Sequence, residues 1–462
     1  MFNSLEKFKK NIALINNNED EYSYEHLLKL INLINAKIKK RSLILLITSN
    51  SAESIIGYVS FIKFNNVTIL LDNNFTIEYA NKIIKKYQPN YIFSPKNYLQ
   101  KAGTILACNF LKEYSLIKTN YKTHNKINSK NFLLLSTSGT TQSPKFVRLS
   151  KKNLHSNTKN IINYLGIKSS HTTITTMPMG YSYGLSIINT HLESGSKIIV
   201  NNKTIFDREF WKKIIKYKVT SLGGVPQFYE QLKKIKFENF DLSSLKYLTQ
   251  AGGKLEIFFL KYFGNICKKN KLKFFVMYGQ TEASPRMSYL DWKKLFSKME
   301  SIGKPLKGSK FKIIDKRKKY INKPFMNGEL VYYGENVSLG YAHSLKDLNK
   351  GNINKGKLYT GDLAYKDKQG YFYIVGRKNR FSKIFGKRID LDDIEKKLNK
   401  DNFKIKCIPD NKFLKIEIIN DYNLDEIKKV INNLYGINQN FILIQKVKKF
   451  THQNYFKDIK KV

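Results

Sequence analysis

Cysteine is scarce in this chain of 462 residues. Its three cysteines, Cys108, Cys267 and Cys407, stand far apart, which excludes a cysteine-based metal site or a CxxC redox pair. No apolar run approaches the ~20 residues that a transmembrane helix needs. The first residues, MFNSLEKFKK, lack the apolar stretch and the small-residue cleavage site of a secretory signal. We therefore expect a cytoplasmic protein without a membrane span.

Acidic residues and arginine are also few. The chain has 82 basic and 36 acidic residues, a formal net charge of +46, yet only eight of the basic residues are arginine. Proteins that bind nucleic-acid phosphates usually concentrate arginine in patches, whereas lysine is spread along this whole chain. We therefore expect no specific nucleic-acid partner, although a basic surface can steer an acidic partner such as a carrier protein. A hydrophobic content of 42% excludes a disordered chain.

Helical and strand-like patterns alternate through the first two thirds of the sequence. Residues 22–40 have apolar side chains at helical spacing, and Ser23 is placed to cap that helix. A buried strand over 41–47, a helix over 54–64 and a strand over 67–71 follow. Such alternation predicts an α/β fold with largely buried sheets.

The pattern changes near Ser301, where short strands separated by Gly- and Asp-rich turns replace the helices. The last 80 or so residues follow the order strand, helix, two strands, helix, strand. We therefore predict a large domain over 1–378, built of α/β sheet subdomains and a β-rich subdomain. A small, mobile α+β lid domain is predicted over 379–462.

The first segment that suggests chemistry is LLLSTSGTTQSPKF, at 133–146. An apolar strand leads into a loop of small hydroxyl residues, whose hydroxyl and backbone N–H groups are good donors to a polyphosphate. Lys145 adds a positive charge. The loop is not a Walker motif, because Pro144 stands where the second glycine belongs. The alternative interpretation is a solvated Ser/Thr loop.

The second segment is FVMYGQTEAS, at 275–284, where a strand runs into a turn. Such strand ends commonly surround a nucleotide. Tyr278 is placed to stack on a base, Thr281 to donate to a phosphate oxygen, and Glu282 to bind Mg²⁺, which prefers oxygen ligands. A capped helix start is the alternative.

The third segment runs over 358–395. Asp362, in a turn, is placed to accept hydrogen bonds from a ribose. Three of the eight arginines, Arg377, Arg380 and Arg388, lie within twelve residues, which indicates a need for planar donors.

Together and in this order, the segments resemble the adenylate-forming (AMP-binding) superfamily of acyl-CoA synthetases, luciferases and peptide-synthetase adenylation domains. The resemblance covers nearly the whole chain. STSGTTQSPKFVRLS resembles the phosphate loop of the family, and YGQTE its YGxTE motif. YTGDLAY, GYFYIVGRKNR and FGKRIDLDDIE resemble its TGD, GRxD and GxRIxxxEIE segments, and YSYEHL the motif that opens these domains.

The resemblance implies ATP, Mg²⁺ and a thiol as cosubstrates, and assigns roles by position. Thr281 would contact the α-phosphate, Glu282 would bind Mg²⁺, and Asp362 would hold the ribose beside Arg377. The remaining ATP-binding residues would be Thr137, Ser138, Gly139, Thr140, Thr141 and Lys145 around the phosphates, and Gly252, Gly253, Tyr278 and Gly279 near the adenine.

The resemblance also implies two mobile elements near the C-terminus. Lys457 would bridge the attacking carboxylate and the α-phosphate, with Lys460 and Lys461 as neighbouring alternatives. Asn379 would be the hinge between the domains, where the family usually has Asp or Lys.

The sequence departs from the family at two phosphate-loop glycines, which Gln142 and Phe146 replace. Because glycine allows close backbone approach, these changes leave the activity of the loop open.

The implied function is that of an AMP-forming acid–thiol ligase. It adenylates a carboxylic acid and passes the acyl group to coenzyme A or to the phosphopantetheine of a carrier protein. Amino-acid-activating relatives pair the substrate ammonium with an aspartate, but 177–196 contains no acidic residue before Glu193. We therefore expect a non-amino acid, with Tyr181, Tyr183, Gly224 and Val225 in the wall of the acyl pocket.

Two alternatives stay open: an amino-acid-adenylating enzyme that loads a carrier protein, and a non-catalytic acyl or nucleotide sensor on the same fold. The sequence does not identify the acid, the thiol or the oligomeric state.

Overall fold

The computed structural model describes residues 1–96, 98–99, 103–106, 111–122, 127–136, 145–377, 381–384, 387–400, 403–410, 413–447 and 450. The chain divides into two compact units. The first comprises Met1–Ser136, Lys145–Phe311 and Tyr332–Leu358, and the second contains Lys312–Val331 and the described residues from Tyr359 onward.

The first unit contains an eight-stranded sheet. Its central strands run parallel, because helices cross over between them, and the strands at both ends pair antiparallel. The strand order is β19 (Gly340–Ala342), β9 (Phe146–Leu149), β8 (Leu133–Ser136), β4 (Val67–Asp72), β3 (Leu43–Thr48), β5 (Tyr91–Pro95), β7 (Tyr114–Lys118) and β6 (Thr104–Leu106).

A second run of strands in this unit is parallel from β14 to β1. Its order is β16 (Ser301–Pro305), β15 (Arg286–Leu290), β14 (Lys273–Gly279), β13 (Tyr247–Gln250), β12 (Ser221–Gly224), β10 (Thr172–Ile174), β11 (Lys197–Ile199), β1 (Ile12–Ile15) and β2 (Glu21–Ser23). In register, Gly224 lies opposite Gln250, which lies opposite Val276. The carboxyl ends of β12, β13 and β14 therefore meet at one edge, where α/β proteins usually bind ligands.

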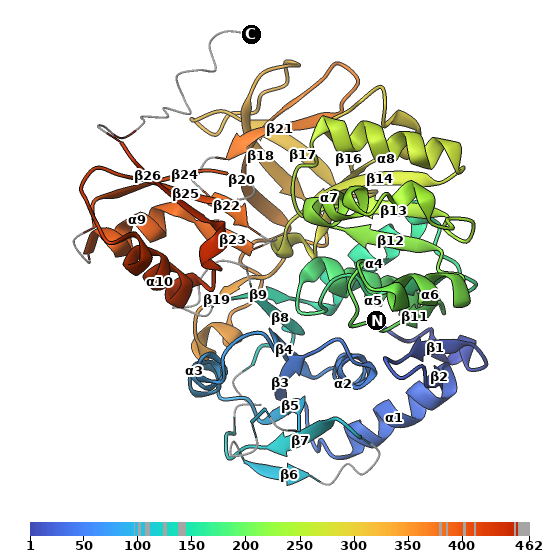
Figure 1. The fold of residues 1–462 in the computed structure, drawn as a ribbon. Coiled ribbons are helices and arrows are strands. Elements are labelled where there is room, and N and C mark those ends of the chain that lie inside the picture. The colour runs from blue at the N-terminus through green and yellow to red at the C-terminus, as the bar shows by residue number, and fades with distance from the viewer. Residues whose placement is uncertain are drawn as a thin grey trace. The chain divides into compact units, whose positions relative to one another are not determined.

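Eight α-helices of the described residues belong to the first unit. They are α1 (Tyr24–Ala36), α2 (Ala52–Lys63), α3 (Ile77–Tyr87), α4 (Lys151–Leu165), α5 (Ser182–Glu193), α6 (Arg208–Lys216), α7 (Pro226–Lys234) and α8 (Ile257–Lys269). Side chains of α1, α2 and α5 share one apolar core with strands of both sheets, so these helices join the sheets (Figure 1).

Local sequence explains where the first helix begins. The Ser23 hydroxyl accepts a hydrogen bond from the backbone N–H of His26 at 3.0 Å, which confirms the predicted cap. The strand predicted over 41–47 is β3, whose six residues are all buried. The next helix begins at Ala52, two residues earlier than predicted, because the Ser51 hydroxyl accepts from the N–H of Ser54.

The second unit contains most of β18 (Gly328–Tyr333), most of β20 (Lys357–Lys366) and all of β21 (Phe372–Arg377), which follow one another in the sheet. Most of β17 (Lys310–Ile314) belongs to it too and pairs next to β18. Further along the chain of this unit, the predicted order of elements is confirmed from the first helix onward, but two strands precede that helix where one was predicted. The elements are β22 (Phe381–Ile384), β23 (Lys387–Asp390), α9 (Leu391–Lys400), β24 (Ile405–Ile408), β25 (Leu414–Ile418), α10 (Leu424–Tyr435) and β26 (Ile442–Lys446).

The elements from β22 to β26 enclose an apolar core of their own, which is why they form a compact α+β body. The mixed α/β fold class is thereby confirmed. The predicted boundary between 378 and 379 lies outside the described residues and stays a prediction. In the ranges that the structure describes, no helix combines the length and apolarity needed to cross a membrane.

Candidate active site

Glu282 is the best-defined carboxylate among the predicted site residues of the first unit. It lies in a short 3-10 helix, η5 (Thr281–Ala283), directly after β14. The side chain is buried, and its Oε1 accepts a 2.7 Å hydrogen bond from the Tyr341 hydroxyl. The backbone carbonyl of Glu282 accepts from the N–H of Ser338 at 2.9 Å. The segment around Tyr341 therefore fixes both the backbone and the carboxylate of Glu282.

Lys145 approaches the same tyrosine from the other side. Its Nζ lies 4.9 Å from the centre of the Tyr341 ring, within cation–π range. Tyr341 pairs with Val147 across β19 and β9, and this register brings the end of the predicted phosphate loop to the tyrosine. The tyrosine thus connects the predicted phosphate-binding lysine with the predicted Mg²⁺ ligand.

Tyr341 was missed by the sequence analysis. It is one of 29 tyrosines, and nothing in its local pattern distinguishes it from the others.

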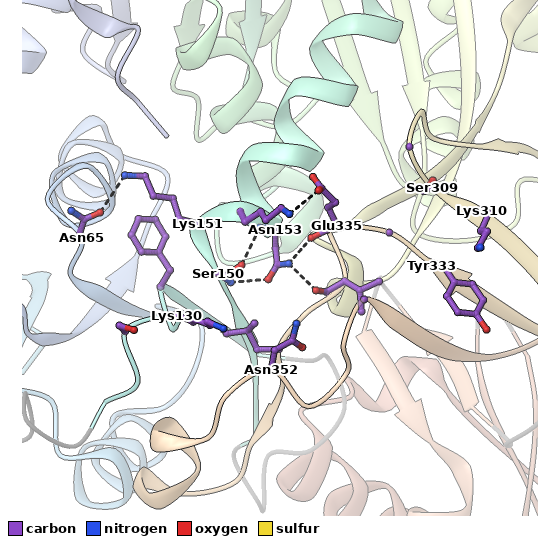
Figure 2. Close-up of a pocket in the computed structure, with 18 of the residues that line it drawn as sticks. Asn65, Lys130, Ser150, Lys151, Asn153, Ser309, Lys310, Tyr333, Glu335 and Asn352 are labelled. Carbon is purple, nitrogen blue, oxygen red and sulfur yellow. Dashed lines mark hydrogen bonds and ion pairs between the residues drawn. The ribbon is translucent and has the colours of Figure 1, made fainter.

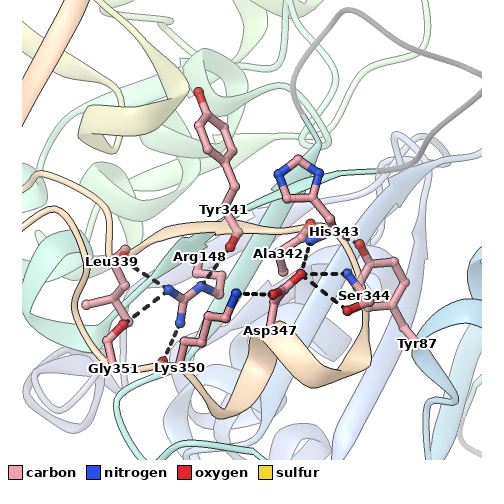
Figure 3. Close-up of polar contacts among 10 residues, drawn as sticks. All are labelled: Tyr87, Arg148, Leu339, Tyr341, Ala342, His343, Ser344, Asp347, Lys350 and Gly351. Atoms are coloured by element: carbon pink, nitrogen blue, oxygen red, sulfur yellow. Dashed lines mark hydrogen bonds and ion pairs between the residues drawn. The ribbon is translucent and has the colours of Figure 1, made fainter.

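Arg148 fixes the segment that carries Tyr341 (Figure 3). Its buried guanidinium donates to the backbone carbonyls of Tyr341 at 3.2 Å, and of Leu339 and Gly351 at 3.1 Å each. It also donates to the carbonyl of Lys350. A buried guanidinium with this many acceptors orients the whole loop, because each donor specifies the position of one carbonyl.

Asp347 stabilises the same loop through contacts within it. Its carboxylate accepts from the N–H groups of His343 at 2.7 Å and Ser344 at 3.0 Å, and forms a 2.6 Å ion pair with Lys350. Burial opposes ionisation of this carboxyl, but Lys350 and the backbone donors outweigh it and hold the pKa of Asp347 at about 2.

Phe146 stands where the family usually has a glycine. Its ring is buried and packs edge-on against Tyr87, with ring centres 5.2 Å apart. This departure thus adds a core side chain to β9. Gln142 lies outside the described residues.

Thr281 connects this site to α5. Its hydroxyl lies 3.1 Å from the hydroxyl of Ser182, the first residue of that helix. Tyr181 and Tyr183 flank Ser182, so this contact joins the predicted phosphate residue to the predicted acyl wall.

The predicted acyl and adenine residues gather at the shared strand edge. Gly224 ends β12, and Val225 caps α7. Gly252 has φ +88°, and a Cβ there would lie 2.8 Å from the Tyr181 hydroxyl and 2.9 Å from Cγ1 of Val225. Glycine is therefore required at this position by conformation and by space. The next residue, Gly253, accepts a 2.8 Å hydrogen bond from Gln250 at its carbonyl.

The two other residues predicted to lie near the adenine, Tyr278 and Gly279, are at the end of β14. The Tyr278 ring contacts Phe311 edge-on at 6.2 Å. At Gly279, a Cβ would come within 1.8 Å of the Pro285 carbonyl oxygen, so only glycine permits this turn.

Three residues of the predicted acyl wall, Tyr181, Tyr183 and Val225, belong to one apolar cluster. Tyr183 is buried there, its hydroxyl bonds Thr249, and burial raises its pKa to about 12. The cluster and the side chains packed on it are Ile161, Leu165, Ile167, Met177, Tyr183, Tyr247, Ala251, Phe275 and Met277, with Ile162, Tyr164, Tyr181, Ile187, Val225 and Tyr289.

In the second unit, Asp362 and Arg377 lie directly opposite each other on β20 and β21. Arg377 Nε forms a 2.7 Å ion pair with Asp362 Oδ1, and the carboxylate is almost fully buried. Asp362 and Arg377 therefore lie beside each other, as predicted.

Other predicted site residues cannot be placed. Thr137, Ser138, Gly139, Thr140 and Thr141 lie outside the described residues. The same is true of the hinge residue Asn379 and of Lys457.

The possible metal ligands at this site suit a Mg²⁺ ion that is bound jointly by the protein and a nucleotide. Across the described ranges, no group of three His, Cys, Asp or Glu side chains is arranged to hold a metal ion by itself. Mg²⁺ is often bound through one or two carboxylates, with substrate phosphates supplying further oxygens. The single buried carboxylate of Glu282, next to Lys145 and Tyr341, suits that mode.

A cavity of about 980 Å³ lies apart from these residues, near the start of α4 (Figure 2). None of the predicted site residues lines it. Among its basic side chains, Lys152 pairs with Glu335 at 2.7 Å, and Lys151 donates to Asn65 at 3.2 Å. Asn153 completes a capping box with Ser150 and donates to the carbonyls of Glu335 and Val337. These contacts hold the α4 terminus against the neighbouring loop.

Comparison with known proteins identifies the family. A family model described as "AMP-binding enzyme" matches residues 1–342. A 2-succinylbenzoate–CoA ligase of Bacillus cereus (strain AH820) is 29% identical over 247 residues. That match covers 53% of this chain and 49% of the relative, so the chain spans about half the length of the curated relatives it matches.

Solved structures extend the likeness of fold to nearly the whole chain. The o-succinylbenzoate CoA synthetase of Bacillus subtilis, bound to a product analogue, superposes with a TM-score of 0.76 at 18% identity, covering 98% of this chain and 96% of that one. The same enzyme has been solved with ATP and a magnesium ion. The amide bond synthetase McbA from Marinactinospora thermotolerans gives a TM-score of 0.79 at 14% identity, covering 98% and 97%.

The fold and the family match thus define an adenylate-forming architecture. The chain belongs to the family of AMP-binding enzymes.

Proposed function

We propose that the protein is an AMP-forming acid–thiol ligase. The observation that carries this proposal is the arrangement of Lys145, Tyr341 and Glu282, in which one tyrosine contacts both the predicted phosphate lysine and the predicted Mg²⁺ ligand. Family membership and the likeness to an enzyme solved with ATP and magnesium support it.

The first half-reaction forms a mixed anhydride. The substrate carboxylate attacks the α-phosphorus of ATP, the bond to the β-phosphate oxygen breaks, and pyrophosphate leaves. Because negative charge approaches negative charge, the protein must supply positive charge and donors. The family resemblance assigns Lys145 and the hydroxyl residues of the predicted loop to the phosphates, and Thr281 to the α-phosphate. When bound at Glu282, Mg²⁺ neutralises the charge that develops on the phosphate oxygens.

The second half-reaction transfers the acyl group. A thiol attacks the acyl carbonyl, a thioester forms, and AMP leaves with the former carboxylate oxygen. No nucleophilic side chain is required. Coenzyme A is the expected thiol, because the named relatives are CoA ligases. The phosphopantetheine of a carrier protein is the alternative acceptor.

The substrate is proposed to be a carboxylic acid other than an α-amino acid. In this proposal, Tyr181, Tyr183, Gly224 and Val225 border the acyl group. The segment 177–196 offers no acidic residue before Glu193 that could pair with an ammonium. We keep the cytoplasm as the expected setting, since Cys267 and Cys407 are buried free thiols.

Acid-dependent exchange of pyrophosphate into ATP tests the proposal. We expect exchange with at least one member of a panel of short, long, aromatic and dicarboxylic acids, and its loss in Glu282→Gln. A matched control is Glu335→Gln, because Glu335 is an exposed carboxylate outside the site. A folded protein that binds ATP but exchanges with no acid would instead favour the sensor alternative.

A further inference from the structure

Arg286 is a buried cation that the proposed mechanism does not use. It begins β15, four residues after Glu282, and only 3% of it is exposed. Its Nε has no hydrogen-bond partner, and none of the ion pairs within the described part of the chain includes it. Arginine is rare in this lysine-rich chain, so a buried one indicates a need for its planar donor group.

The other fully buried arginine shows what a structural role looks like here. Each nitrogen of the Arg148 guanidinium donates to at least one backbone carbonyl. Arg286 differs because its guanidinium donates to no backbone carbonyl of the described residues. Its side chain interacts with the Tyr164 hydroxyl, and its backbone makes the remaining polar contacts. Its carbonyl accepts from the amides of Asn157 and Asn336 at 2.7 Å each, and its N–H donates to Asn157 at 3.4 Å.

The guanidinium lies against the predicted acyl wall. Its central carbon is 4.0 Å from the centre of the Tyr183 ring, in a stacked cation–π contact. Burial raises the pKa of Tyr164, Tyr181 and Tyr183, and the nearby Arg286 charge opposes that rise in all three. No carboxylate is among the groups that shift the pKa of these three phenols most strongly.

A buried positive charge that faces aromatic rings and lacks an anion is costly unless a ligand supplies the anion. A carboxylate matches the guanidinium fork, because its two oxygens accept two parallel N–H bonds. An α-ammonium group would be repelled at the same place. The position thus favours an anionic group on the part of the substrate that does not react.

We propose that Arg286 binds the second carboxylate of a dicarboxylic acid substrate, so that the protein activates one end of a diacid and holds the other. This inference rests on the proposed acid–thiol ligase function. Arg286 then determines specificity, while Glu282 and Lys145 serve the reacting end.

The test compares diacids with analogues that lack only the second charge. Pyrophosphate exchange is measured on the full chain with 2-succinylbenzoate and with straight-chain diacids, each beside its monomethyl ester. We expect kcat/KM for one diacid to exceed that for its ester by roughly 100-fold, because removing one partner of a buried charge pair has effects of this size.

Variants of Arg286 then test whether this residue causes the preference for diacids over their esters. Arg286→Gln should lose roughly the same factor toward the diacid while exchange with the ester is unchanged, and Arg286→Lys should restore part of the loss. Arg208→Gln is the control, because Arg208 is an exposed arginine on α6. Thermal melting establishes that each variant is folded.

Several results would overturn the inference. Equal exchange with diacids and esters in the unaltered protein would do so without any variant, and would leave the ligase function standing. An equal loss toward diacid and ester in Arg286→Gln would place the arginine at the reacting carboxylate. No exchange with any acid would remove the ligase proposal and this inference together.

Discussion

The hydroxyl of Tyr341 donates a 2.7 Å hydrogen bond to the buried carboxylate of Glu282, across 59 residues of sequence. The same ring lies under the ammonium of Lys145. Because a buried carboxylate needs donors to remain oriented, this hydroxyl is a positioning group for the predicted Mg²⁺ ligand.

Tyr341→Phe should therefore weaken nucleotide use without unfolding the protein. It keeps the ring under Lys145 but leaves one oxygen of Glu282 without its donor. We expect kcat/KM for MgATP in pyrophosphate exchange to fall roughly tenfold to a hundredfold, as for other groups that orient metal ligands. Tyr320→Phe is the control, because Tyr320 is 56% exposed. An unchanged Mg²⁺ dependence would contradict the positioning role.

Gly252→Ala should impair adenylation through steric clash. At φ +88° the new Cβ would be strained and would approach the Tyr181 hydroxyl to 2.8 Å. Gly308→Ala is a matched control, because Gly308 has φ +77° with nothing within 4 Å of an added Cβ.

Both variants should lose about 1 kcal/mol of unfolding free energy from backbone strain, and only Gly252→Ala should lose exchange activity. Denaturant unfolding and exchange assays measure the two effects separately. Equal activity losses would show that the clash with Tyr181 is unimportant.

Arg148→Met should destabilise the first unit by about 3–5 kcal/mol. The substitution removes donors to the carbonyls of Leu339, Tyr341, Lys350 and Gly351, and buried acceptors without donors are costly. Urea unfolding followed by tryptophan fluorescence measures the change, with Arg208→Met as the exposed control. A loss below about 1 kcal/mol would mean that the loop is held by other contacts.

Stability should fall as the pH drops from 6.5 toward 4. Burial lowers the pKa of His191 to about 4, whereas an unfolded histidine titrates near 6.5. Between these values the unfolded state binds a proton that the folded state does not, so the free energy of unfolding decreases as pH falls.

The shift corresponds to a loss of up to about 3 kcal/mol. His171, whose pKa burial also lowers to about 4, adds to the same slope. His191→Gln should flatten the dependence of the melting temperature on pH, whereas the same change at the exposed His155 should not.

Lys457→Ala should abolish adenylation and spare thioester formation from a supplied acyl-adenylate. The family resemblance places this lysine at the attacking carboxylate, and only the first half-reaction needs that charge. The same change at Lys460 is the control. If Lys460→Ala abolishes exchange instead, the role belongs to that neighbour.

Much of this protein was predictable because the relevant signals are local. The Ser23 cap, the buried strand β3 and the α+β order of the C-terminal elements each follow from residues within a few positions of one another. The order of the motifs likewise predicted the family, since phosphate, metal and ribose ligands must occupy fixed places along one fold.

Tertiary structure alone decided which side chains meet. The pairing of β19 with β9 brings Tyr341 to the end of the phosphate loop, and the Tyr341 hydroxyl meets Glu282 across 59 residues of sequence. Arg148 binds a loop about 200 residues away. No local pattern encodes such contacts, because they depend on sheet register and chain crossover. The absence of an acidic partner for Arg286 among the described residues is of the same kind. Sequence shows that an arginine is present, but only the packed structure shows that burial surrounds it with tyrosines and that no described carboxylate pairs with it.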